Sequence, residues 1–124
     1  MIYLTLPLPP NAANARRNWR VALKQKKAYW AHLNMLQGRL YRPTEPLNPA
    51  HIAVRYHVWN LMDDDNAMHR AKPLLDWLKG VYIVDDSRKH LVWDRIPEQV
   101  IDRKNPRVIV ALSREVTEPF AKAS

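Results

Sequence analysis

Residues 52–80 read IAVRYHVWNLMDDDNAMHRAKPLLDWLKG, and this stretch decides the fold. From Ile52 to Trp59 the side chains alternate in character, which is typical of a β-strand with two different faces. Three aspartates, Asp63–Asp65, follow the strand directly. Beyond them, apolar residues recur every three or four positions up to Gly80, which predicts an amphipathic helix. The stretch therefore predicts a strand, an acidic turn and a helix in succession.

Individual residues predict where this helix begins, where it ends and where it is interrupted. Asp64 or Asp65 is expected to cap its first turn, because aspartate accepts hydrogen bonds from free helical N–H groups. Gly80 is expected to end it, since glycine tolerates the left-handed backbone that closes many helices. Pro73 lacks an N–H group and clashes with the preceding turn. We therefore predict a kink or a restart near Lys72.

The flanking sequence predicts one further helix and several strands. A helix is expected from Val21 to Leu40, where apolar residues fall mostly at helical spacing. The remaining strands are expected at Ile2–Leu6, Val81–Val84, Leu91–Ile96 and Val108–Leu112. A chain of 124 residues can bury one modest core. The predicted fold is α/β (α+β): a single small domain, 1–124, with a mixed β-sheet and two main helices.

The chain is strongly basic. It has 20 Lys and Arg against 12 Asp and Glu, which gives a formal charge of +8 and a pI near 10.0. This balance favours nucleic acid as a partner over an anionic membrane surface. No apolar stretch reaches the roughly 18 residues needed to span a bilayer, and the N-terminus lacks the pattern of a secretory signal. Because cysteine is absent, we expect a cytoplasmic protein without disulfides or thiolate metal sites.

Five aspartates, Asp63–Asp65 and Asp85–Asp86, are the main functional signal. Clustered anions are unfavourable without a cation, and carboxylate oxygens are the ligands that Mg²⁺ or Mn²⁺ takes. In an extended segment Asp63 and Asp65 would point to one side while Asp64 faces away. A strand-helix-strand unit could then return Asp85 and Asp86 beside them. The alternative is that Asp63–Asp65 form only a charged turn and a helix cap.

A metal held in this way could bind a phosphodiester oxygen, generate hydroxide and stabilise the developing negative charge. Lys72 is the candidate for a positive charge beside the scissile phosphate. The alternative interpretation is that Lys72 is only a solvated lysine on the helix surface. His69 and Arg70 lie less than one turn earlier and are the other candidates for the role of Lys72 beside the phosphate.

Two basic segments are candidates for contact with DNA. The first contains Arg16, Arg17, Arg20, Lys24 and Lys27, together with Lys26 and the aromatic Trp19. Arginine binds phosphate in a forked geometry, and an aromatic ring can stack on an exposed base. A solvated helix face is an equal alternative for the lysines. The second segment is Arg88-Lys89, which directly follows Asp86.

Taken together, these motifs resemble the RusA-type Holliday junction resolvases, small phage and bacterial endonucleases. The resemblance covers most of the first 90 residues, in this order: Leu4-Thr5-Leu6-Pro7-Leu8-Pro9-Pro10-Asn11, Asp63-x-Asp65-Asn66, Lys72-x3-Asp76-x-Leu78 and Val84-Asp85-Asp86. Each piece alone is weak, but the ordered combination is specific.

The resemblance implies a homodimer that binds four-way DNA junctions and nicks two strands symmetrically with Mg²⁺ or Mn²⁺. It gives Asp63, Asp65 and Asp86 the essential acidic roles, Lys72 the catalytic lysine role, and Asp85 an accessory role at the metal. Lys72 lies six positions after Asn66, nearly a helical turn further than in the compact form of the motif.

Two other functions are compatible with the sequence. One is a protein of the same fold that binds branched DNA without cutting it. The other is a metal phosphohydrolase that acts on small substrates. A pure binder does not need Asp63, Asp65 and Asp86, and a small-substrate hydrolase does not need the long basic surface.

Overall fold

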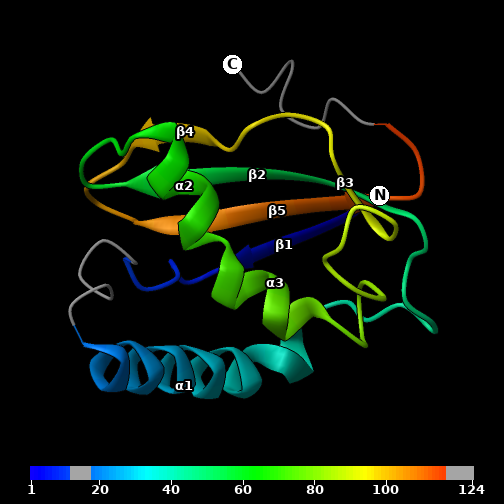
Figure 1. The fold of residues 1–124 in the computed structure, drawn as a ribbon, viewed down its shortest axis with the longest axis horizontal. Coiled ribbons are helices and arrows are strands. Elements are labelled where there is room, and N and C mark those ends of the chain that lie inside the picture. The colour runs from blue at the N-terminus through cyan, green and yellow to red at the C-terminus, as the bar shows by residue number, and fades with distance from the viewer. Residues whose placement is uncertain (12–17, 117–124) are drawn as a thin grey trace.

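A computed structural model describes residues 1–11 and 18–116 of the chain (Figure 1). Strands and helices alternate in the first half, and three strands complete the second half. The elements are β1 (Ile2–Leu6), α1 (Trp19–Leu36), a 3₁₀ turn (Gln37–Arg39), β2 (Ala50–Val58), α2 (Asp64–Arg70), α3 (Lys72–Leu78), β3 (Leu91–Trp93), β4 (Glu98–Ile101) and β5 (Arg107–Ser113). The predicted α+β fold with a mixed sheet is confirmed.

The five strands form one sheet with β2 at its centre. β5 pairs antiparallel with both β1 and β2. On the other side of β2, β3 pairs in parallel with its first residues and β4 pairs in parallel with its last residues. The edge beside β2 is therefore made of two short strands, and each of them marks one end of β2.

The helices pack against one face of this sheet, and α2 and α3 run across it in Figure 1. The alternation in β2 places every second side chain on this face, which explains the pattern seen in the sequence. The core is formed by side chains that are almost completely buried: Leu4, Leu6, Ile52, Val54, Tyr56, Val58, Leu74, Leu78, Tyr29 and Leu33. α1 joins the core through the buried Tyr29 and Leu33, and the partly buried Trp30 packs against it as well. Within the described residues, no helix is long and apolar enough to cross a membrane.

The predicted interruption of the second helix is confirmed. α2 ends at Arg70 and α3 begins at Lys72, with Pro73 in the first turn of α3, where its missing N–H group costs least. Gly80 follows α3 with a φ of 82°, as expected for a helix-ending glycine. The predicted cap was wrong by one or two residues, because Asp63 is the N-cap of α2 and its side chain makes no capping hydrogen bond.

Three predictions about strands need correction. Residues 81–84 form a tight turn, in which Ile83 makes isolated bridges with Leu47 and with Lys79, and they are not a strand. Their apolar side chains close the end of α3, because Tyr82 and Ile83 are fully buried there. β3 stops at Trp93 instead of Ile96, and β4 was not predicted. The strand expected at Val108–Leu112 is confirmed, with one more residue at each end.

Candidate functional site

A face of α3 carries alternating charges that gather around Asp76. Lys72, Asp76 and Lys79 are spaced at i, i+4 and i+7, so they lie on one side of the helix. The Asp76 carboxylate lies 3.2 Å from Lys72 Nζ and 3.3 Å from Lys79 Nζ. Lys26 of α1 reaches the same carboxylate at 2.9 Å. One aspartate therefore holds three ammonium groups and ties α1 to α3.

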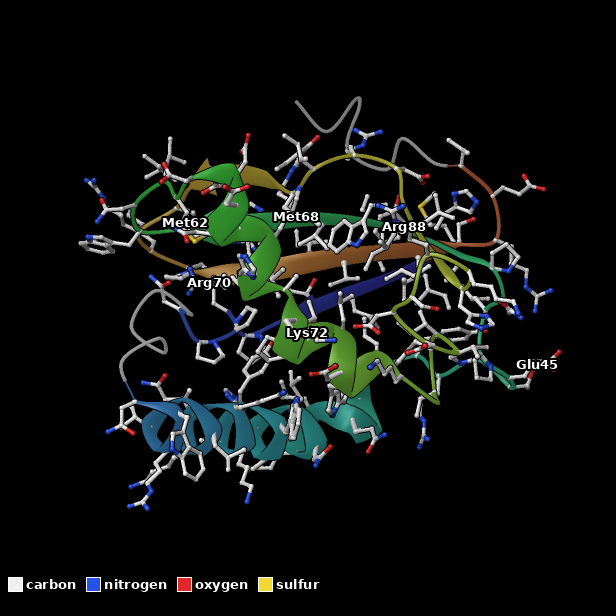
Figure 2. All side chains as sticks on the ribbon, in the orientation of Figure 1. Glu45, Met62, Met68, Arg70, Lys72 and Arg88 are labelled. Carbon is white, nitrogen blue, oxygen red and sulfur yellow. The ribbon has the colours of Figure 1, made fainter. Side chains whose placement is uncertain are left out.

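The loop after α3 adds two more carboxylates to this group. Asp86 contacts Lys72 Nζ directly, and its other oxygen lies 3.1 Å from Lys79 Nζ. Asp85 lies 3.5 Å from Lys79 Nζ, and its carboxylate accepts a hydrogen bond of 2.9 Å from the backbone N–H of Asp86. We call these residues the lysine–aspartate cluster: Lys26, Lys72, Lys79, Asp76, Asp85 and Asp86. Figure 2 shows Lys72 on α3 at the centre of the molecule.

Four members of the cluster, Lys72, Lys79, Asp76 and Asp86, have pKa values shifted toward the charged form. The pKa of Asp86 is lowered to about 2: the hydrogen bond from Lys72 has the largest effect, burial opposes it, and a hydrogen bond from Lys79 adds to the lowering. The same hydrogen bonds to Asp86 raise the pKa of Lys72 and of Lys79. Burial raises the pKa of Asp76, but hydrogen bonds from its lysines outweigh burial and lower the pKa overall. Lys72 is thus a fixed positive charge in this arrangement and not a proton donor.

The low pKa of Asp86 predicts how stability depends on pH. A carboxyl group whose pKa is lower in the folded chain stabilises the fold above its unfolded pKa, and this contribution is lost as pH falls through the folded value. For Asp86 the loss falls between pH 3.8 and about 2. We expect the free energy of unfolding to fall less steeply below pH 4 in Asp86→Asn than in the unaltered protein. Urea denaturation at a series of pH values measures this, with the exposed Asp64→Asn as matched control. Equal slopes for Asp86→Asn and the unaltered protein would contradict the ion pair.

Asp63, Asp64 and Asp65 lie at the start of α2, and all three are exposed. Asp63 has an extended backbone (φ −62°, ψ 153°), but Asp64 and Asp65 already belong to the helix. The expected extended segment, with Asp63 and Asp65 on one side, is therefore wrong, because residues two apart do not share a face of a helix. Their charges favour the start of the helix, where free N–H groups carry partial positive charge.

The two acidic groups lie toward opposite ends of β2. Asp63 follows the last residues of β2, whereas Asp86 precedes β3, whose Leu91 pairs with Ala50 at the start of β2. Asp86 contacts Lys72, and the seven residues of α2 separate Lys72 from Asp63. In Figure 2, Met62, which precedes Asp63, is separated from Lys72 by the length of α2. The expected return of Asp85 and Asp86 beside Asp63 and Asp65 is wrong for a single chain, because no strand carries them back along β2.

No metal centre is formed within residues 1–11 and 18–116, where no three His, Asp or Glu side chains are grouped to hold an ion. Asp76 and Asp86 are bridged by lysine ammonium groups instead. The carboxylates of one chain do not fit Mg²⁺ as they stand. Roles for Asp63, Asp65, Asp85 and Asp86 at a metal therefore stay predictions.

Arg70, one of the two other candidates for the role of Lys72, makes its contacts away from the lysine–aspartate cluster. Its Nε donates a 2.8 Å hydrogen bond to the carbonyl of Pro9, and its guanidinium lies 3.4 Å from the sulfur of Met62. Arg70 thus holds the proline-rich segment after β1 against the start of α2. His69 is exposed on α2. Lys72 is the member of this trio that contacts Asp86.

The basic residues predicted to contact DNA form two separate surfaces. Arg16 and Arg17 lie outside the described residues. Arg20, Lys24 and Lys27 are exposed on α1, which starts with Asn18 as a cap. The exposed Trp19 lies beneath the Arg20 guanidinium at 5.4 Å. Arg88 and Lys89 are exposed in the loop after Asp86, near the cluster (Figure 2).

Sequence reasoning missed Lys79 and placed Lys26 only in the basic segment that is a candidate for contact with DNA. The spacing of Lys72, Asp76 and Lys79 was a readable signal for Lys79, because these positions share a helix face. Lys26 had no such signal, since its pairing with Asp76 depends on how α1 docks against α3.

Comparison with known proteins does not assign the chain: no protein-family model, no curated protein and no solved structure matches it. The function of the protein is therefore inferred from the positions and charges of its own residues.

Proposed function

We propose that this protein is a Mg²⁺-dependent endonuclease that acts as a homodimer on four-way DNA junctions. The observation that carries the proposal is the contact between Lys72 and Asp86, which are 14 residues apart and belong to separate parts of the sequence motif. Asp76, a third motif residue, joins the same contact. A motif whose members meet in space is more than a chance match in sequence.

The charge distribution supports DNA as the substrate. The chain has a net charge of +8, and Arg88 and Lys89 directly follow Asp86. Exposed arginine and lysine side chains neutralise phosphates and release counterions, which supplies most of the affinity of non-specific DNA binding. Arg20, Lys24 and Lys27 add a second exposed basic surface on α1.

We propose that the acidic residues act across the two protomers of the dimer. The Asp63–Asp65 group and the Asp85–Asp86 group of one chain lie toward opposite ends of β2, so a single chain does not bring them together. A second copy, related by two-fold symmetry, can supply the missing group to each site. A Mg²⁺ ion bound there would polarise a phosphodiester oxygen and activate water.

One observation favours the non-cleaving alternative. Asp76, Asp85 and Asp86 are each within 4 Å of a lysine ammonium group, so the cluster has matched charges without any metal. Such a cluster could serve only to hold α1, α3 and the following loop together. A protein of this kind would bind branched DNA through its basic surfaces and leave it intact.

A junction-cleavage assay separates the two functions. We expect the purified protein to bind a synthetic four-way junction more tightly than a linear duplex and, with Mg²⁺, to introduce paired nicks. Affinity should fall by about 10³-fold or more between 50 and 200 mM salt if six or more phosphates are contacted. Denaturing gels of end-labelled strands measure the nicks. Binding without nicks in either Mg²⁺ or Mn²⁺ would support the binder, and salt-insensitive binding would contradict both readings.

A further inference from the structure

A pocket of about 330 Å³ opens between α1 and α3, next to the lysine–aspartate cluster. Its size is at the lower end of the range for small-molecule sites. The lining residues come from both helices and from the turn after α3: Trp30, Asn34, Gln37, Asp76, Trp77, Val81 and Tyr82. Three of these are aromatic, and Asp76 is the centre of the cluster.

The aromatic side chains of the pocket are held in fixed positions. Trp30 Nε1 donates a 2.9 Å hydrogen bond to the carbonyl of Pro73, and Trp77 Nε1 donates one of 2.9 Å to Asn34 Oδ1. The Tyr82 hydroxyl donates a 2.7 Å hydrogen bond to the carbonyl of Tyr41. Tyr82 is fully buried behind the pocket, whereas Trp30 and Trp77 are partly exposed and, with their N–H groups used inside the protein, offer a ligand only apolar ring surface. A planar aromatic ligand is the natural match for such walls.

Two amides add polar groups that suit the edge of a base. Asn34 is oriented by Trp77, since its oxygen accepts the indole N–H and its amide nitrogen is left as a donor. Gln37 supplies a second amide one turn later on the same side. Asparagine and glutamine recognise the donor and acceptor pattern on the edges of nucleobases.

Ammonium groups lie at the border of the pocket. Lys26 Nζ lies 4.9 Å from the centre of the Trp30 ring and 2.9 Å from the carboxylate of Asp76, which also holds Lys72 and Lys79. A nucleotide whose base entered the pocket would have its phosphate near these lysines. Aromatic rings next to cations form the recurring platform of proteins that bind single-stranded nucleic acid.

We propose that this pocket binds one unpaired nucleobase of the DNA that lies on the cluster. The inference deepens the proposed function and rests on it. A base within duplex DNA is stacked and paired and cannot enter, whereas a base near the centre of a branched molecule costs less to extrude. The pocket would then hold the strand by its base, and Lys72, whose side chain is the most exposed of the three lysines in the cluster, is the cation that the adjacent phosphate would meet.

The test compares a short single-stranded oligonucleotide with a matched one in which every nucleotide is abasic, so that both carry the same phosphates. Binding is measured by fluorescence anisotropy in EDTA, which prevents cleavage. We expect the unaltered protein to prefer the normal strand by about 5- to 150-fold, the effect of stacking one base. In Trp77→Leu this preference should fall to less than about twofold. Asn34→Ala should also reduce it, because the substitution removes the amide and releases the Trp77 indole that Asn34 orients.

Trp59→Leu is the matched control, since Trp59 is an exposed indole directly after β2 and lies outside the pocket. It should keep the preference for the normal strand. Equal binding of both strands by the unaltered protein, or loss of the preference in Trp59→Leu but not in Trp77→Leu, would overturn the inference. If Trp77→Leu fails to fold, Asn34→Ala decides alone.

Junction binding, measured in the same buffer, distinguishes failure of the base-pocket inference from failure of the proposed function. Tight junction binding together with equal affinity for normal and abasic strands refutes only the base pocket. Absence of binding to any DNA at low salt refutes the proposed function and the pocket together.

Discussion

Replacing Asp86 with asparagine is expected to lower junction cleavage by at least about 100-fold, because the substitution removes a proposed ligand of the Mg²⁺ that would stabilise the transition state. Asparagine keeps the size of the side chain, but its single oxygen can accept a hydrogen bond from only one of the two lysines that contact the carboxylate. The contacts of Lys79 with Asp76 and Asp85 remain to hold the loop after α3. What is lost is the negative charge, which the hydrogen bond from Lys72 maintains by lowering the pKa of Asp86 to about 2. Binding of DNA should persist or increase, because the substitution adds a positive charge to the surface.

The measurement is single-turnover nicking of an end-labelled junction with Mg²⁺, with affinity measured separately in EDTA. Asp64→Asn is the matched control, because it removes the same charge from an exposed position on α2. It should leave both the nicking rate and the affinity close to those of the unaltered protein. Equal loss of nicking in both variants would show that only total charge matters, and normal nicking by Asp86→Asn would remove Asp86 from the site.

The elements with strong periodic patterns could be predicted from the sequence. β2 alternates because one face meets the helices, and the second helix breaks where Pro73 requires it. The turn at 81–84 was mistaken for a strand because its residues are apolar and include β-branched ones. Their burial serves to close α3: Gly80 N–H donates a 2.7 Å hydrogen bond to the carbonyl of Ile83, a contact that no pattern of hydrophobicity reveals.

The candidate site was predictable only in part, because it depends on packing between distant segments. The sequence indicated Lys72, Asp76 and Asp86 as motif residues, and the structure brings all three together. It also suggested that Asp63 and Asp65 would join them. That step depended on a strand at 81–84, which the structure does not form, and Asp85 and Asp86 lie in the loop that leads to β3.

Mixing two inactive variants is expected to restore cleavage. If each site uses Asp65 from one protomer and Asp86 from the other, a heterodimer of Asp65→Asn and Asp86→Asn chains contains one intact site and one doubly altered site. Free exchange of an equal mixture makes half of the dimers heterodimers, so about a quarter of the sites recover in a two-fold symmetric dimer. Because only one site per dimer is intact, the products should be single nicks instead of paired ones.

The matched control is a mixture of Asp63→Asn and Asp65→Asn. These residues lie together at the start of α2, so every site in their heterodimer lacks one of them and the mixture should stay inactive. Chain exchange is verified by purifying the mixture through a tag on one variant and detecting the other. If exchanged Asp65→Asn and Asp86→Asn remain inactive, the acidic residues do not act across protomers. A single chain would then have to bring them together, which requires α2 and the loop after α3 to leave the positions that they occupy at opposite ends of β2.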